Sequence, residues 1–201
     1  ISQTLYWPGQ GLGYIGNHTF SLYGQDPTTT ILKWAGPIYT PMIWFSTGGG
    51  TSFSRLTFDG QNIAGSEGIR CEWSQATPNY GNNGDESRIQ DCIFKDLAYG
   101  IRRSIVASVG YFRDISILRN RFYRCSSYGV YLQDSSYNTK DWWIRQCYFE
   151  QCHIGVGGQP SGTQVNFSDV NAPSYIGATA TYLLTEVSVA FGGSGYNEND
   201  V

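Results

Sequence analysis

A segment of about 27 residues recurs three times in the chain, and this repeat restricts the fold more than any other feature of the sequence. The copies begin at residues 87, 114 and 141, and each reads Ile, two residues, Cys or Asn, one residue, Phe, and later Gly-Ile or Gly-Val. The phenylalanines Phe94, Phe122 and Phe149 are 28 and 27 residues apart. A period between about 20 and 50 residues is typical of solenoids.

Each copy contains short segments that alternate apolar and polar residues, separated by glycine and polar turns, and no sustained run at helical spacing. Stacked coils pair identical strands one turn apart and place identical side chains in ladders. We therefore predict an all-β fold, a single-stranded right-handed parallel β-helix, with Phe94, Phe122 and Phe149 in one inward ladder. Gly, Asn, Asp and Ser are expected at the corners, and Asp59 is interpreted as a turn residue before a Gly60 of positive backbone angle.

The whole chain, residues 1–201, is predicted to form one β-helix domain. Residues 1–52 are expected to form an N-terminal cap and irregular first coils, and residues 53–160 the regular coils. Residues 161–201 are expected to form a C-terminal coil or cap with a frayed tail, either a true cap or the stump of a longer helix. Insertions at residues 74–86 and 135–140 are expected to project from one face and to build a binding surface.

Composition argues against several classes of function. Charged residues make up 14% of the chain and the net charge is −3, whereas a nucleic-acid-binding protein carries a clustered basic surplus. No apolar run approaches the roughly 20 residues of a membrane span. Few charges and many aromatic residues suit an extracellular or cell-surface protein. No signal peptide is present, and because the chain begins at Ile1 we expect a leader or further sequence to have been removed.

The chain contains five cysteines, and the segment QCYFEQCH raises the question of a metal site. A zinc site needs four converging ligands, and the spacing here is Cys-x4-Cys rather than a paired Cys-x2-Cys set. In stacked coils, small apolar thiols are ordinary core fillers. We therefore predict no metal site and free, buried thiols, while a disulfide between Cys125 and Cys152 stays open. Two ladders are expected to hold Cys92, Asn120 and Cys147, and Leu97, Cys125 and Cys152.

The segments GQDPTTTILKWAG, FSRLTFDGQNIAGSEGIRCEW and the three repeats, ending in DWWIRQCYFEQCHIGV, resemble the pectate-lyase-like superfamily of right-handed parallel β-helices. The resemblance covers roughly residues 19–158 and is specific for the fold rather than for an activity. It implies a carbohydrate-active protein, because most members are polysaccharide lyases and glycoside hydrolases, with phage tailspikes and adhesins beside them. The Asn-Thr-Asp, Asp-Asp, Gly-His-Gly and Arg-Ile-Lys segments of polygalacturonases are missing, and the nearest match is NTK at residues 138–140.

Alternation in the strand that follows the repeated glycine predicts a surface row. If Ile69, Ile101, Val130 and Val156 point inward, the next residues point outward. This row suits an acidic sugar chain, since arginine pairs with carboxylates and tyrosine stacks on ring faces. The alternative is a solvated wall with incidental charges. The predicted outward row is Arg70, Arg102, Tyr131 and Gly157, followed by a row of Glu72, Ser104, Gln133 and Gln159.

Two functions from different classes follow. The first is an enzyme acting on an acidic polysaccharide by β-elimination or hydrolysis, in which calcium, held partly by Glu72, neutralises a uronate while Arg102 removes a proton. The second is a non-catalytic glycan-binding or structural β-helix, such as an adhesin or tailspike segment. In both, the predicted substrate-binding residues are Arg70, Tyr131, Gln133 and Trp143.

Two positions test the predicted alternation. Arg103 points inward in this register, so either a partner such as Asp134 meets it near the coil edge or the strand ends at Arg102. Trp142 and Trp143 are expected to face opposite ways, one in the core and one at the surface. The surface indole is either a sugar platform or packs beneath the insertion at residues 135–140.

Overall fold

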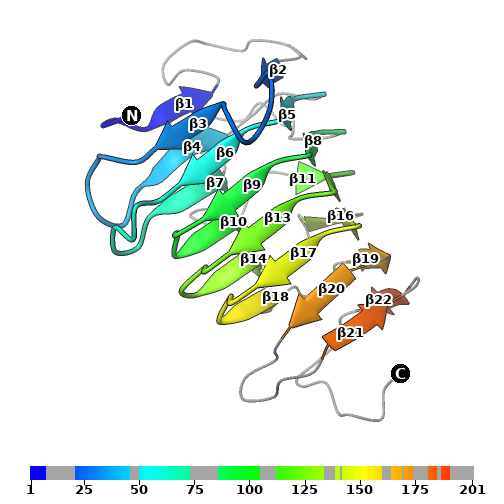
Figure 1. The fold of residues 1–201 in the computed structure, drawn as a ribbon. Helices are drawn as coiled ribbons and strands as arrows, with labels where there is room; N and C mark the ends of the chain where they lie inside the picture. Colours follow the sequence, from blue (N-terminus) through cyan, green and yellow to red (C-terminus); the bar gives the residue numbers. More distant parts are fainter. Residues whose placement is uncertain are drawn as a thin grey trace.

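The computed structural model describes residues 1–7, 21–45, 50–72, 86–104, 112–133, 139–140, 142–159, 164–168, 170–173, 181–184 and 187–190. In these residues the chain is all-β, with no helix, and forms a parallel β-solenoid of about four turns (Figure 1). Nothing in the described part of the chain is a helix long and apolar enough to cross a membrane.

Three sheets run along the solenoid, and each coil passes through them in the order B, C, A. Sheet A contains β1 (Leu5–Trp7), β4 (Pro41–Phe45), β7 (Glu67–Cys71), β10 (Tyr99–Arg103), β14 (Tyr128–Gln133) and β18 (Ile154–Gln159). Sheet B contains β2 (Ser21–Tyr23), β5 (Ser52–Ser54), β8 (Arg88–Gln90), β12 (Ser116–Leu118), β16 (Trp142–Arg145), β19 (Gln164–Ser168) and β22 (Val187–Ala190). Sheet C contains β3 (Ile31–Lys33), β6 (Thr57–Asp59), β9 (Ile93–Lys95), β13 (Arg121–Tyr123), β17 (Tyr148–Glu150), β20 (Val170–Pro173) and β21 (Thr181–Leu184).

Two further strands, β11 (Phe112–Arg113) and β15 (Thr139–Lys140), pair in parallel beside the main sheets. Within the three sheets the pairing is parallel until the C-terminal end of the stack. There β22 pairs with β19, and β21 with β20, in the antiparallel sense. Sheets B and C therefore end on reversed strands.

The phenylalanine ladder predicted from the repeat is confirmed. Phe94, Phe122 and Phe149 are fully buried and occupy one register in sheet C, and Phe58 extends the ladder by one coil. Neighbouring rings are stacked with centroids 4.8, 5.0 and 4.7 Å apart. This continuous ring stack is part of one hydrophobic core, whose buried residues extend along the chain from Trp34 to Cys152.

The repeated glycine of sheet A is required by close packing against this stack. A Cβ atom at Gly100 would lie 2.5 Å from the Gly129 carbonyl oxygen and 2.6 Å from the Phe122 ring. Gly68 meets Phe94 in the same way, at 2.7 Å. The glycine therefore lets sheet A approach the phenylalanine rings, which explains why Gly and Phe recur together in the sequence.

The prediction that Gly, Asn, Asp and Ser supply the backbone angles of the corners is only partly confirmed, because arginine and glutamine adopt left-handed backbone there beside aspartate and asparagine. Left-handed backbone occurs mostly at charged and amide residues: Arg55, Asp91, Arg119 and Gln146 at the corner between sheets B and C, and Asp96, Arg124 and Gln151 at the corner between sheets C and A. The expected positive angle of Gly60 is also wrong, since Gln61 and Asn62 adopt it instead. Gly60 is needed for space, because a Cβ atom there would lie 2.3 Å from the Asp96 carbonyl oxygen. Asp59 is the last residue of β6 rather than a turn residue, and its Oδ1 accepts a hydrogen bond from the Gln61 amide in the turn that follows.

The corner ladder of Cys92, Asn120 and Cys147 is buried, as predicted, and so is the ladder of Leu97, Cys125 and Cys152. Asn120 links the coils, since its Oδ1 accepts a hydrogen bond from the Cys92 amide at 2.9 Å and its Nδ2 donates to the Ile89 carbonyl at 2.8 Å. All five cysteines are free thiols. Cys125 and Cys152 share a hydrogen bond, which together with burial raises the pKa of Cys125.

Candidate functional site on the outer face of sheet A

The outer face of sheet A carries two rows of side chains that we call the arginine row and the tyrosine row. The arginine row is the one predicted from alternation, and Arg70, Arg102, Tyr131 and Gly157 are indeed register partners on successive strands. Their neighbours Ile69, Ile101 and Val130 are fully buried, which confirms the inward direction. Trp44 extends the arginine row by one coil, as the register partner of Arg70. The tyrosine row is Glu67, Tyr99, Tyr128 and Ile154.

The two rows lie on the same side because the alternation breaks at the repeated glycine. The Cβ direction of Gly68 points at the Phe94 ring, so Gly68 and Ile69 both face the core. Glu67 and Arg70, three positions apart, therefore meet outside the coil. The same geometry brings Tyr128 and Tyr131 into contact, with ring centroids 4.7 Å apart.

Glu67 holds two arginines from neighbouring coils. Its Oε1 lies 2.7 Å from Nη2 of Arg70 and 2.7 Å from Nη1 of Arg102, and its Oε2 accepts a hydrogen bond from Nε of Arg70 at 2.7 Å. A carboxylate that receives three charge-assisted hydrogen bonds is a strong local anchor. It fixes both guanidinium groups in the surface.

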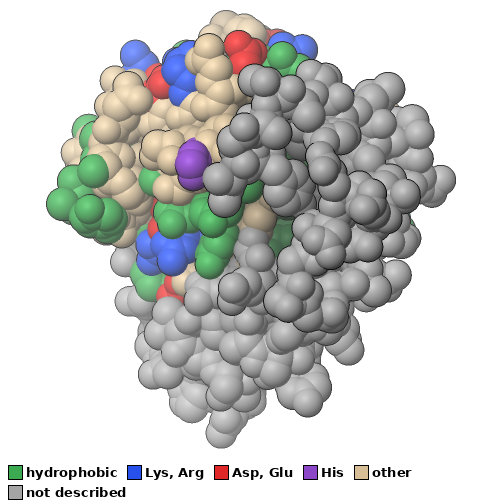
Figure 2. Space-filling model, turned by 90° about the horizontal axis from the view of Figure 1, so that it is seen from below, with side chains coloured by type: hydrophobic (Ala, Val, Ile, Leu, Met, Phe, Trp, Pro, Cys, Tyr) green, Lys and Arg blue, Asp and Glu red, His purple; other side chains and the backbone are tan. Residues whose placement is uncertain are grey.

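The carboxylates and the guanidinium groups of this site lie at different depths. The Glu67 and Glu72 side chains are 1% and 3% exposed, whereas those of Arg70 and Arg102 are 14% and 26% exposed. The carboxylates thus lie beneath the arginines. Although the four formal charges cancel, the groups that a ligand meets first are cationic. In Figure 2, which views the stack from its C-terminal end, Lys and Arg side chains lie directly beside side chains of the hydrophobic class, which includes tyrosine.

Aromatic rings surround the arginines. The Arg70 guanidinium carbon lies 5.2 Å from the centroid of a Trp44 ring, and that of Arg102 lies 4.8 Å from the Tyr99 ring and 6.0 Å from the Tyr131 ring. Tyr99 also stacks on Tyr128, with centroids 5.8 Å apart. Burial, with smaller contributions from Tyr128 and Tyr99, raises the pKa of Tyr131, so this phenol is neutral at physiological pH. Cations over ring faces are attracted by the ring quadrupole.

Glu72, the predicted calcium ligand, lies just beyond the end of β7. Its Oε2 is 3.9 Å from Nε of Arg70, and its backbone carbonyl accepts a hydrogen bond from the indole Nε1 of Trp44 at 3.0 Å. Its carboxylate is therefore buried beside a guanidinium. Among the described residues, no three His, Cys, Asp or Glu side chains cluster closely enough to hold a metal ion.

The two remaining predicted binding residues, Gln133 and Trp143, lie in different sheets. Gln133 is the last residue of β14 and the register partner of Gln159, so these two residues share a row as predicted, while the Gln133 side chain lies outside the described structure. Trp143 is in β16 of sheet B, paired with Ser116, so the structure does not bring it to the arginine row. Its ring contacts the Arg145 guanidinium, 4.0 Å from the centroid. Trp142 is fully buried, so the predicted opposite directions of the two indoles are confirmed.

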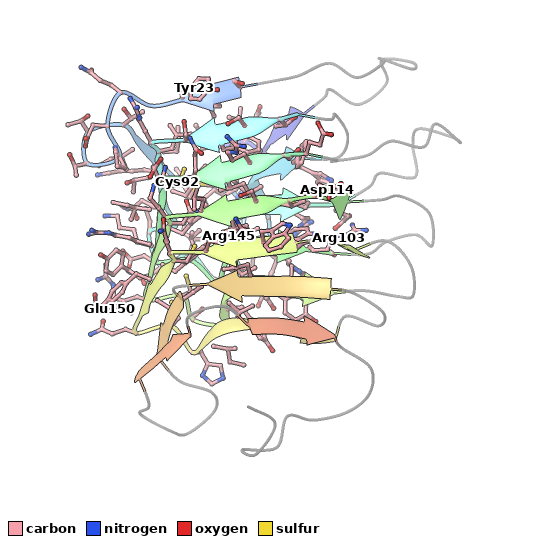
Figure 3. All side chains as sticks on the ribbon, turned by 90° about the vertical axis from the view of Figure 1, so that its right-hand side faces the viewer. Tyr23, Cys92, Arg103, Asp114, Arg145 and Glu150 are labelled. Carbon is pink, nitrogen blue, oxygen red and sulfur yellow. The ribbon has the colours of Figure 1, made fainter. Side chains whose placement is uncertain are left out.

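Arg103 is buried, and β10 continues through it rather than ending at Arg102. Its Nη1 donates to the backbone carbonyls of Ser104, at 2.8 Å, and Cys71, at 3.3 Å. The suggested partner Asp134 lies outside the described residues. Arg103 is labelled in Figure 3, near the edge of the stack.

Sequence reasoning missed Glu67, Trp44, Tyr99 and Tyr128. One signal was available for three of them: Glu67, Tyr99 and Tyr128 each stand immediately before the repeated glycine and two residues before the buried Ile or Val. Strict alternation assigns that position to the core. Only the inward direction of the glycine itself turns these side chains outward.

The coils, the ring stack and the arginine row define a parallel β-solenoid with an aromatic and cationic outer face on sheet A. The sequence matches no known family model, and neither the curated proteins nor the solved structures contain a significant match to this chain.

Proposed function

We propose that the outer face of sheet A binds an acidic polysaccharide, with Arg70 and Arg102 pairing with its carboxylates and the aromatic rings packing on its sugar faces. The observation that supports this most directly is the arrangement around Glu67. A buried carboxylate holds two partly exposed guanidinium groups on adjacent coils. Binding to carboxylates is what a prepositioned guanidinium does best.

The spacing of the coils suits a chain ligand. Neighbouring strands of a sheet lie about 4.8 Å apart, so equivalent groups recur at that interval along the solenoid axis. Trp44, Arg70, Arg102 and Tyr131 occupy four consecutive positions of this kind. A polymer lying along the axis meets one such group per coil, and its affinity is the sum of several modest contacts.

The resemblance to the pectate-lyase-like superfamily supports the same proposal, since its members act mostly on polysaccharides. We include in the proposal a right-handed winding, in keeping with the usual hand of parallel strand crossovers, and an extracellular or cell-surface location. The proposal is one of binding. Arg102 is engaged by Glu67, and Glu72 is buried beside Arg70, so these contacts suit charge neutralisation better than proton abstraction or calcium ligation.

The test measures binding of polygalacturonate and alginate oligosaccharides to the full chain by calorimetry at low and high salt. Arg102→Ala is expected to weaken binding several-fold at low salt, and the loss should shrink at high salt because exposed charges are screened. Arg124→Ala is the matched control, since Arg124 is also an arginine paired with a carboxylate, that of Asp96, but belongs to the corner before sheet A and not to its strands. No binding at low salt, or an equal loss in both variants, contradicts the proposal.

β-Elimination by Arg102 is a separate hypothesis about the same surface. It predicts that ultraviolet-absorbing unsaturated uronates accumulate when the protein is incubated with these polymers, with calcium or without it. Binding without product formation would identify the surface as a non-catalytic glycan-binding site.

A further inference from the structure

A groove with a volume of about 760 Å³ lies on the outer face of sheet C, beside the corner where each coil passes from sheet B. This volume is in the range of about 300–1,000 Å³ typical of ligand sites. Three consecutive coils line it with equivalent positions, and the turn at Pro27 and Thr28 lies at its N-terminal end. None of its lining residues belongs to sheet A, so the groove is separate from the arginine row.

The groove is elongated along the solenoid axis. Ile93, Arg121 and Tyr148 are register partners on β9, β13 and β17. With strands about 4.8 Å apart, the first and third of these positions are separated by about 10 Å. The groove therefore accommodates a linear ligand that crosses three coils.

Several polar groups of the groove are available to a ligand. Arg119 is paired with Asp91, since its Nε and Nη2 donate to the two carboxylate oxygens at 2.7 and 2.8 Å. In contrast, Arg121, Gln146 and Glu150 make no side-chain hydrogen bond or ion pair with any other described residue. Figure 3 shows Glu150 pointing away from the coils on this side of the molecule.

An exposed aromatic ring lies in the middle of these groups. Tyr148 is 39% exposed on the outer side of β17. Its ring is tilted against that of Tyr123, with centroids 6.3 Å apart. Tyrosine combines an apolar face with a hydroxyl that donates and accepts hydrogen bonds. A sugar ring has the same combination of an apolar face and peripheral hydroxyls.

The charges of the groove balance. Asp91 neutralises Arg119, and the unpaired Arg121 is matched by the unpaired Glu150. A strongly charged ligand would therefore gain little, whereas hydroxyl groups can accept from the guanidinium and donate to the carboxylate and amide. We propose that this groove binds an uncharged oligosaccharide, stacked on Tyr148 and hydrogen-bonded by Arg121, Gln146 and Glu150. This site is independent of the acidic-glycan surface on sheet A.

The test measures the binding of cellohexaose, maltohexaose and chitohexaose to the full chain by calorimetric titration. At least one of them is expected to bind, and Tyr148→Ala should weaken that binding about tenfold, as loss of one stacked ring implies. Arg121→Ala should also weaken it. Tyr23→Ala is the matched control, because Tyr23 is an exposed tyrosine of sheet B outside the groove.

The salt dependence of binding distinguishes this proposal from the one for sheet A. Binding of an uncharged sugar in the groove should be the same at low and high salt, whereas binding of polygalacturonate through Arg102 should weaken with salt. Failure of all three neutral hexasaccharides to bind would overturn the groove proposal and leave the sheet A proposal intact. Equal losses in Tyr148→Ala and Tyr23→Ala would overturn it as well.

Discussion

Glu67 and Arg102 meet across two neighbouring coils, with Oε1 of the carboxylate 2.7 Å from Nη1 of the guanidinium. Glu67 holds Arg70 of its own strand through both carboxylate oxygens at the same time. The carboxylate is buried and the arginines are partly exposed. One side chain thus links two coils and fixes the direction of both cations on the outer face of sheet A.

Replacement of Glu67 by glutamine should lower both stability and acidic-glycan binding. We expect the free energy of unfolding to fall by about 1–3 kcal/mol, less than for a fully buried pair, because both arginines reach solvent. Urea unfolding measures this loss. Glu150→Gln, which removes a carboxylate without an ion pair, is the control and should change stability by less than about 0.5 kcal/mol. Equal effects would show that Glu67 is not an anchor.

Truncation of the central ring of the phenylalanine stack should be among the most damaging substitutions. Phe122→Ala is expected to cost about 3–5 kcal/mol of unfolding free energy, as for other buried aromatic residues. Arg121→Ala, on the exposed neighbour in the same strand, should cost less than about 0.5 kcal/mol. Chemical denaturation of both variants checks the register, because a reversed order would mean that the strand faces the other way.

Addition of one methyl group to the repeated glycine should disturb the contact between sheet A and the rings. A Cβ atom at Gly100 would lie 2.5 Å from a backbone oxygen, which cannot move without shifting the next coil. We expect Gly100→Ala to destabilise the fold by about 1–3 kcal/mol or more, because overpacking a close-packed core forces backbone shifts. A Tm equal to that of the unmodified protein would contradict the close approach.

Stability should fall as the pH rises above about 9, partly because of the buried thiols. Burial raises the pKa of Cys71, Cys92 and Cys147 from 9.0 to about 12. Between these values the unfolded chain loses protons that the folded chain retains, so the thiols favour folding fully below pH 9 and progressively less up to about 12. Cys147→Ala should show a shallower decline of the urea midpoint with pH than the unmodified chain. If the urea midpoints of the variant and of the unmodified chain declined equally with pH, the Cys147 thiol would not be a cause of the lost stability.

The ladders could be predicted from the sequence because they depend on period alone. Phe94, Phe122 and Phe149 recur at intervals of 28 and 27 residues, and stacked coils convert such nearly equal intervals into neighbours on adjacent coils. The direction of Arg70 and Arg102 followed from alternation with Ile69 and Ile101. These are local rules, and they hold wherever a strand is regular.

Other features of the site and of the corners could not be predicted from the alternation of apolar and polar residues. Glu67 faces outward because Gly68, which has no side chain, takes an inward position next to Ile69. Trp143 was predicted only as a surface indole that binds substrate, and its place in sheet B depends on the number of corners between two strands, which is not visible in a hydropathy pattern. The left-handed angle at Asp91 agrees with the expectation of Asp at the corners, whereas the angle at Arg119 was missed because arginine adopts this backbone less readily than Gly, Asn or Asp does. There, the side chains link successive coils through an ion pair.

The phenylalanine stack has an energetic consequence for pairs of substitutions. Each inner ring shares one face with the ring above and one with the ring below, so neighbouring coils interact as units in a one-dimensional array. Removing both Phe94 and Phe122 destroys their common interface once, and the double variant should lose less than the sum of the two single losses. Phe58 and Phe149 share neither an interface nor a stacking partner, and their losses should add. Unfolding measurements on these two double variants would therefore give the coupling free energy between adjacent turns of the solenoid.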